Sequence, residues 1–142
     1  MAFRDLKEGT ELPARTFPAL TRTDFVRYQG ASGDMNPIHH DEEYARSAGY
    51  PSVFSVGMLQ AGLLATYATD LLGPDNVRRF SISFREQVWP GDVLVATGTI
   101  TKVYEADEEP RVELDLTMSR QGGGVAIKGE ATFATDELGE DD

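Results

Sequence analysis

Residues 57–72 read GMLQAGLLATYATDLL, and a glycine and a proline follow at positions 73 and 74. The stretch is almost entirely apolar, and glycine followed by proline is a common helix end. At about 1.5 Å per residue, the helix would be roughly 24 Å long. It carries four polar residues, namely Gln60, Thr66, Thr69 and Asp70. These polar residues favour a helix buried in a protein core over a membrane span.

Downstream of this helix, the sequence predicts an antiparallel sheet. Runs of β-branched and apolar residues separated by turn signals lie at 77–88, 92–104, 111–120 and 125–134. In the third run, apolar residues alternate with charged or polar ones, so one face is expected to be wet and the other to pack on the helix. Four successive strands suggest a meander. Pro90-Gly91 and the glycines at 122–124 are interpreted as turns between strands.

Upstream of the long helix, two short helices are expected. Residues 10–20 form an extended entry segment, and Thr21 or Thr23 can cap a helix that runs to about Gly30. Asp41 can cap a second helix over residues 42–48, which Gly49 ends.

Between these two helices lies the stretch SGDMNPIH, residues 32–39. Pro37 forbids a normal helix interior and biases Asn36 toward extended geometry, so the segment is a shaped loop. The loop holds a carboxyl group, Asp34, and an imidazole, His39. Histidine exchanges a proton near neutral pH, and the two groups could together hold and activate one water. The structural alternative is that Asp34 caps the next element and His39 only packs.

The start of the long helix, at Gly57, is a second candidate functional feature. A helix N-terminus offers unpaired N–H groups and a partial positive charge. A glycine there lets a substrate carbonyl approach the backbone closely, so this position could hold an enolate oxygen.

Together, the SGDMNPIH loop, the Gly57-Met58 helix start and the stretch FREQVWPGDVL at 84–94 resemble the MaoC-like (R)-specific enoyl-thioester hydratases. The resemblance covers roughly residues 10 to 135. It implies an α+β hot-dog fold, in which a curved antiparallel sheet wraps a long central helix, with the active site at a subunit interface. The implied reaction is the reversible hydration of trans-2-enoyl thioesters to (R)-3-hydroxyacyl thioesters, with neither a cofactor nor a metal.

The same resemblance assigns roles to individual residues. Asp34 and His39 match the family's catalytic pair, and the Gly57 N–H matches the donor to the enolate oxygen. The candidates for substrate contact are Asn36, Tyr50, Phe54, Val56 and Met58. Within this set, Asn36 matches a motif residue that shapes the loop. Val56 stands where the family commonly has histidine, and we expect this change to alter the shape or polarity of the pocket.

Two other functions fit parts of the sequence. A hot-dog thioesterase would use a carboxylate to direct water at the thioester carbonyl rather than at C3. A non-catalytic subunit of a heterodimeric dehydratase would explain Val56. The chain retains both Asp34 and His39, and so resembles the catalytic subunits.

The composition narrows the class of protein. The 142 residues suit a single domain over 1–135, followed by an acidic tail at 136–142 that we expect to be disordered. The absence of cysteine excludes disulfides and zinc–thiolate sites, and the two histidines, at 39 and 40, are adjacent, so no metal site is expected. His40 is expected at the surface or behind the site. No export signal is seen, so a cytoplasmic location is the default expectation.

A net charge of −11 argues against nucleic acid as a partner, and no membrane segment is expected. Because acyl carrier proteins are usually acidic, an acyl-coenzyme A thioester is the favoured substrate. The nearest basic patch for its phosphates contains Arg78, Arg79 and Arg85. Open sheet edges would favour a homodimer or higher homo-oligomer, or a heterodimer with a related hot-dog subunit.

Overall fold

A computed structural model describes residues 6–135, and the tail expected at 136–142 lies outside the described residues. The helices are α1 (Arg22–Ser32), α2 (Glu42–Ser47) and α3 (Gly57–Leu72), and two 3-10 turns, η2 (Pro37–His39) and η3 (Pro74–Asn76), accompany them. The strands are β1 (Arg15–Thr16), β2 (Val77–Phe84), β3 (Leu94–Ala106), β4 (Glu109–Arg120) and β5 (Val125–Ala134). The long helix thus has the predicted bounds. In the described part of the chain, no helix has both the length and the apolar character needed to cross a membrane.

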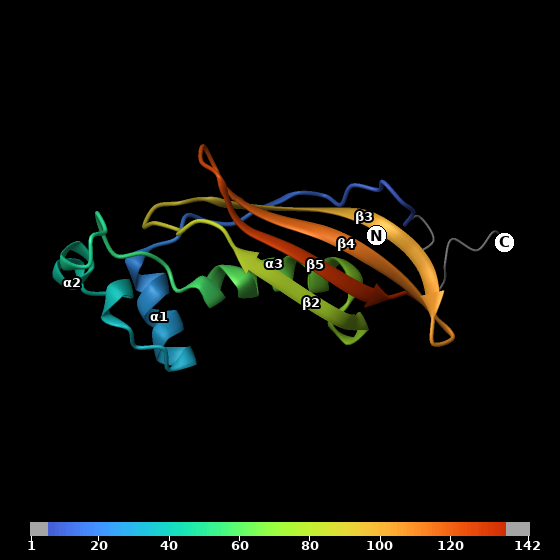
Figure 1. Cartoon of the computed structure of the whole chain (residues 1–142), viewed down its shortest axis with the longest axis horizontal. Helices are drawn as coiled ribbons and strands as arrows, with labels where there is room; N and C mark the ends of the chain where they lie inside the picture. The colour runs from blue at the N-terminus through green and yellow to red at the C-terminus, as the bar shows by residue number, and fades with distance from the viewer. Residues whose placement is uncertain (1–5, 136–142) are drawn as a thin grey trace.

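The strands form one antiparallel sheet in the order β1-β3-β4-β5-β2. The sheet curves along α3, while α1 and α2 lie beyond the N-terminal end of that helix (Figure 1). This is the helix-wrapped sheet expected of a hot-dog fold. Helices α1 and α2 flank the SGDMNPIH loop in the sequence, so the loop also lies beyond the N-terminal end of α3 (Figure 1).

The predicted four-strand meander is wrong for β2. Strands β3, β4 and β5 do follow one another as neighbours, but β2 pairs with β5, from Val77 opposite Phe133 to Phe84 opposite Ile127. The chain therefore crosses the sheet between β2 and β3. Alternation of apolar residues determines which face of a strand is buried, and it carries no information about which neighbour the strand chooses.

The core lies between α3 and the inner face of the sheet. The alternation predicted in the third strand run is confirmed, because Val112, Leu114 and Leu116 of β4 are all buried. They belong to one apolar cluster with α3 residues such as Leu64 and Leu72. Burying each of these side chains stabilises the fold by about 1.5–3 kcal/mol.

Capping residues set the ends of the short helices. Thr21, rather than Thr23, caps α1: its hydroxyl accepts from the Asp24 N–H at 3.2 Å, and the Asp24 carboxylate accepts from the Thr21 N–H at 2.8 Å. The helix continues past Gly30 to Ser32 and ends at Gly33, whose φ of 80° is left-handed. Asp41 caps α2 as predicted, with its carboxylate 3.1 Å from the Tyr44 N–H.

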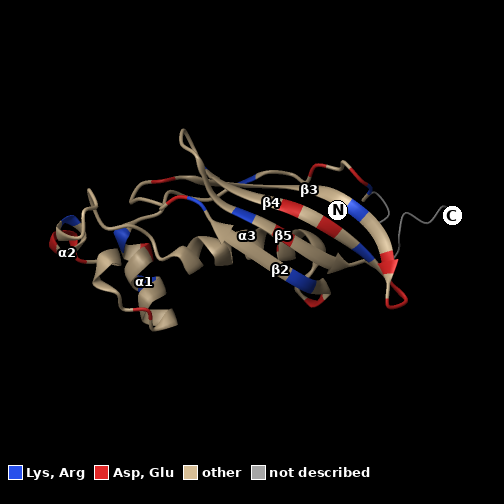
Figure 2. Ribbon diagram, viewed as in Figure 1, with Lys and Arg blue, Asp and Glu red and all other residues tan. Residues whose placement is uncertain are grey.

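The charged residues lie mainly on the strands and loops, whereas α3 is almost uncharged (Figure 2). One cluster ties β2 to β4. Arg78 donates to both carboxylate oxygens of Glu109 at 3.0 and 2.9 Å, and Arg111 donates to the same carboxylate at 2.9 Å. The hydrogen bonds from Arg78 and then from Arg111 hold the pKa of the Glu109 carboxyl below its ordinary value of 4.5.

Candidate active site

The SGDMNPIH loop is shaped by its own polar side chains. Ser32 Oγ accepts from the Asp34 N–H at 3.2 Å, and Asp34 Oδ1 accepts from the Asn36 N–H at 3.3 Å. Asn36 Oδ1 in turn accepts from the Ile38 N–H at 3.1 Å and caps η2, which begins at Pro37. Each side chain thus bonds the backbone two residues away, a pattern favoured by serine, aspartate and asparagine in turns. Asn36 thus holds the turn into η2, and Asp34 lies at the surface.

The sequence analysis missed Gln29, which holds this loop to α1. Its side chain is 1% exposed. Its Nε2 donates to the carbonyl oxygens of Asp34 at 2.9 Å and Asn36 at 3.0 Å, and its Oε1 accepts from Nδ1 of His40 at 2.9 Å. The signal was present in the spacing, because Gln29 lies one helical turn after the buried Phe25 and so on the buried face of α1.

A backbone carbonyl determines the tautomer of His39. The ring is 8% exposed, and its Nδ1 lies 2.8 Å from the carbonyl oxygen of Phe54. A carbonyl oxygen can only accept, so Nδ1 carries the hydrogen, and Nε2 of the neutral ring keeps a free lone pair. The Phe54 ring also meets the imidazole edge to face, with 5.3 Å between centroids. His39 is therefore oriented by one residue through both its backbone and its ring.

An aromatic cluster continues from Phe54. Its ring lies 4.8 Å from that of Tyr50 and 5.7 Å from that of Trp89, measured between centroids. Pro90-Gly91 forms the predicted turn, with the Asp92 N–H donating to the Trp89 carbonyl at 3.0 Å. The indole lies beside Phe54 because the connection from β2 to β3 runs along the segment before α3, where the Ser55 N–H donates to the Val88 carbonyl at 2.8 Å.

His39 and Gly57 line one cavity of about 250 Å³. Its wall comes from His39, from the end of β2 and the residues after it, 84–87, and from four residues around the start of α3, namely Phe54, Ser55, Gly57 and Gln60. The other expected site residues, Asp34, Asn36, Tyr50, Val56 and Met58, do not line it. Val56 is buried, whereas Met58 is 55% exposed.

The start of α3 is open on the side of this cavity. Val56 is the N-cap residue, and none of the described side chains caps the helix. A Cβ at Gly57 would lie 2.9 Å from Cε1 of Phe84, so only glycine fits under this ring without displacing it. Behind it, the buried Ser55 hydroxyl donates to Oε1 of Gln60 at 2.6 Å. The cavity thus combines an imidazole with a free lone pair and a helix N-terminus, which can remove a proton and stabilise a developing negative charge.

The chain is similar to known proteins in both sequence and fold. A family model described as "MaoC like domain" matches residues 7–121. An (R)-specific enoyl-CoA hydratase of Rhodospirillum rubrum is 33% identical over 92% of this chain and 88% of its own. A 3-hydroxybutyryl-CoA dehydratase of Methylorubrum extorquens is 31% identical over 91% and 80% of the two chains. The solved structure of an (R)-hydratase from A. caviae superposes with a TM-score of 0.79 at 25% identity, covering 92% of this chain and 98% of that one.

Proposed function

This chain belongs to the MaoC-like domain family, and on that premise we propose that it catalyses the reversible hydration of trans-2-enoyl-coenzyme A thioesters to (R)-3-hydroxyacyl thioesters. The two relatives named above are a hydratase and a dehydratase of such thioesters. Those names describe the two directions of one reaction. The match extends over most of each chain, and the loop and the cavity that the reaction needs both lie within it.

The observation that carries the proposal is the hydrogen bond from His39 Nδ1 to the Phe54 carbonyl, 2.8 Å long. It leaves Nε2 as a base in the cavity that Gly57 also lines. Nε2 takes a proton from a water as the water oxygen attacks C3 of the enoyl group. The charge that moves to the thioester oxygen is stabilised by the Gly57 N–H. Proton delivery to C2 then completes the addition of one water across the double bond.

Asp34 is assigned the task of orienting that water and helping to deliver the proton to C2. It lies on the same loop as His39, and Gln29 holds the Asp34 carbonyl at 2.9 Å. Its carboxylate faces solvent in the single chain. The assignment therefore requires that substrate and a second subunit cover this side of the loop.

Strand β2 is the place where a second subunit would attach. It forms one edge of the sheet, and it ends at Phe84, whose side chain is 54% exposed and lines the cavity. An open strand edge pairs readily with another chain. We propose a homodimer, in which the partner's β2 continues the sheet and closes the cavity, with pairing to a related hot-dog subunit as the alternative.

Substrate contact is proposed for the residues around this cavity. Phe54 lines it directly, and Tyr50 supports the Phe54 ring. Val56 and Met58 flank Gly57, and Asn36 holds the loop between Asp34 and His39. In this arrangement the aromatic cluster forms the apolar wall beside the acyl group.

The test is to incubate the purified protein with crotonyl-coenzyme A while following the loss of enoyl absorbance and the release of free thiol. Loss of absorbance without thiol, with an (R)-3-hydroxy product on chiral analysis, is the expected result. Thiol release would instead identify a thioesterase. No reaction by the chain alone would contradict the proposal and favour the non-catalytic partner subunit.

A further inference from the structure

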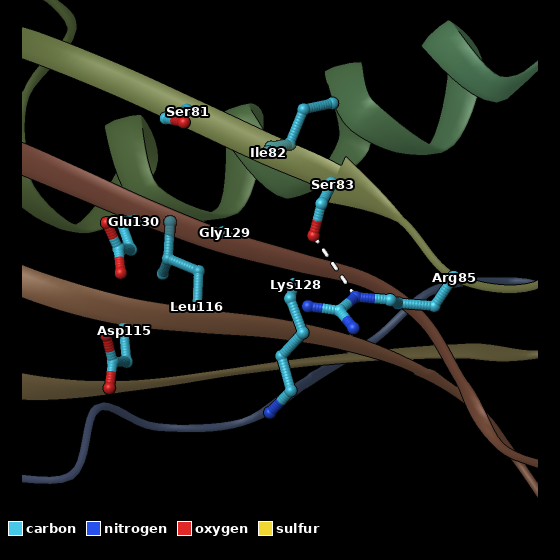
Figure 3. A pocket seen from close by; sticks show the side chains of 9 residues that line it. All are labelled: Ser81, Ile82, Ser83, Arg85, Asp115, Leu116, Lys128, Gly129 and Glu130. Atoms are coloured by element: carbon cyan, nitrogen blue, oxygen red, sulfur yellow. Dashed lines mark hydrogen bonds between the residues drawn. The ribbon is translucent and has the colours of Figure 1, made fainter.

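A second hollow, of about 330 Å³, lies on the outer face of the sheet (Figure 3). Its walls come from the end of β2 and from β4 and β5. Arg85 lines this hollow and also lines the cavity that contains His39 and Gly57. The two hollows therefore meet at one arginine, just past the end of β2.

Arg85 and Lys128 lie at one end of the outer hollow, and Asp115 and Glu130 lie at the other end (Figure 3). The two cations are neighbours because Lys128 of β5 is paired with Ser83 of β2, two residues before Arg85. Opposite charges are thus separated along the hollow, and its positive end adjoins the proposed catalytic cavity.

Both cations are available to a ligand. Arg85 Nε donates to Ser83 Oγ at 3.1 Å, which leaves the two terminal nitrogens of the guanidinium without a protein partner among residues 6–135. Lys128 Nζ donates to Thr117 Oγ1 at 3.2 Å. Within residues 6–135, neither side chain forms an ion pair, whereas six other arginines do, namely Arg15, Arg22, Arg46, Arg78, Arg111 and Arg120. Two unpaired cations in one hollow suit an anion.

We propose that Arg85 and Lys128 bind the phosphate at the end of the pantetheine arm of the thioester substrate. This inference rests on the proposed function, which places the thioester at Gly57. The backbone of a pantetheine arm is about as long as four residues of extended chain, or roughly 14 Å. Gly57, Phe84 and Arg85 line one cavity, and Arg85 also lines the outer hollow. An arm that leaves the cavity past Arg85 therefore enters the hollow at its positive end.

The structure revises the basic patch expected from the sequence. Arg78 is bound to Glu109, with its two nitrogens 3.0 and 2.9 Å from the carboxylate oxygens. Arg79 lines a different hollow, in the company of Glu113 and Glu130. Only Arg85 of the expected patch adjoins the catalytic cavity, and its partner Lys128 lies far along the sequence. Arg79 is an exposed arginine on β2, the strand that ends just before Arg85, and so provides a matched control.

The experiment compares Arg85→Gln, Lys128→Gln and the control Arg79→Gln in hydration of three crotonyl thioesters. These are crotonyl-coenzyme A, crotonyl bound to an acyl carrier protein, and crotonyl-pantetheine, which has no phosphate. The readout is kcat/KM for each phosphate-bearing thioester divided by kcat/KM for crotonyl-pantetheine. Losing one charge-assisted hydrogen bond should lower this ratio roughly tenfold or more in Arg85→Gln and Lys128→Gln, and the ratio should stay at the wild-type value in Arg79→Gln.

The experiment distinguishes the two sources of the phosphate, coenzyme A and an acyl carrier protein. A fall in the ratio for coenzyme A, for the carrier protein or for both supports the subsite and identifies the source. An unchanged ratio for both, or an equal fall in the control, overturns it. If the wild-type chain hydrates none of the thioesters, the proposed function fails by itself. The subsite is then tested by calorimetry, in which 4′-phosphopantetheine should bind the wild type more tightly than pantetheine does, and the two variants should lose that preference.

Discussion

Replacing Gln29 with methionine should loosen the loop that carries Asp34 and His39. Methionine has nearly the same size and flexibility as glutamine, and so it fills the buried site without leaving a cavity. It removes three hydrogen bonds, to the Asp34 carbonyl at 2.9 Å, to the Asn36 carbonyl at 3.0 Å and from His40 at 2.9 Å. The substitution therefore tests the hydrogen bonds separately from the packing.

The expected magnitude follows from these three bonds. A typical hydrogen bond contributes about 1 kcal/mol net. Asp34, Asn36 and His40 are exposed residues and the three bonds are only partly buried, so water can replace part of what the glutamine supplies. We expect the free energy of unfolding to fall by about 2–3 kcal/mol. A loss of about 2 kcal/mol in ordering the loop can also lower the population of the competent geometry, and with it kcat, by up to roughly 30-fold.

Urea denaturation gives the free energy of unfolding, and hydration of crotonyl-coenzyme A gives kcat. Arg27→Met is the control, since Arg27 is an exposed residue on the same helix α1. The control should change the free energy of unfolding by no more than about 0.5 kcal/mol. If Gln29→Met were as stable and as active as the control, the loop would not depend on Gln29, and the reasoning would be refuted.

Three further predictions concern the site and the fold. Asp34→Asn and His39→Gln should each lower kcat by several decades with an unchanged far-UV circular dichroism spectrum, and full activity in both would remove the acid–base assignment. Gly57→Ala should lower kcat/KM because its Cβ would lie 2.9 Å from the Phe84 ring; adding Phe84→Leu should restore part of it, and no recovery would locate the effect elsewhere. The Glu109 carboxyl has a lowered pKa, so its ionised form stabilises the fold above its ordinary value of 4.5, and this contribution is lost as pH falls through the lower folded value. Thermal melts of Glu109→Gln should therefore show a deficit at pH 7 that shrinks below pH 4.5, and a pH-independent deficit would exclude this origin.

Local sequence signals predicted most of the elements. The bounds of α3 and β5 were predicted as they occur, because apolar runs bounded by glycine or proline at one end report on the backbone nearby. Strand β2 ends at Phe84 rather than at residue 88. Residues 85–87 do not pair with β5 and instead line the cavity. The pattern of apolar and polar residues in the sequence does not reveal this change.

For the candidate site too, the sequence predicted some features and missed others. The sequence identified the loop with Asp34 and His39 and the glycine at the start of α3, because proline, glycine and capping residues constrain the backbone through neighbours one to four positions away. It did not identify the partners of these residues. The carbonyl of Phe54 that sets the His39 tautomer and the Gln29 amide that holds the loop reach them across 15 and 5–11 positions.

The sequence alone determined the family, the central helix and the SGDMNPIH loop, since each depends on residue types at short, fixed spacings. Tertiary structure alone decided that β2 lies beside β5, that Trp89 joins the aromatic cluster and that Arg85 meets Lys128. These arrangements bring together segments far apart in the chain. Burial and hydrogen bonding select them only when the whole sheet is assembled around the helix, so no local pattern encodes them.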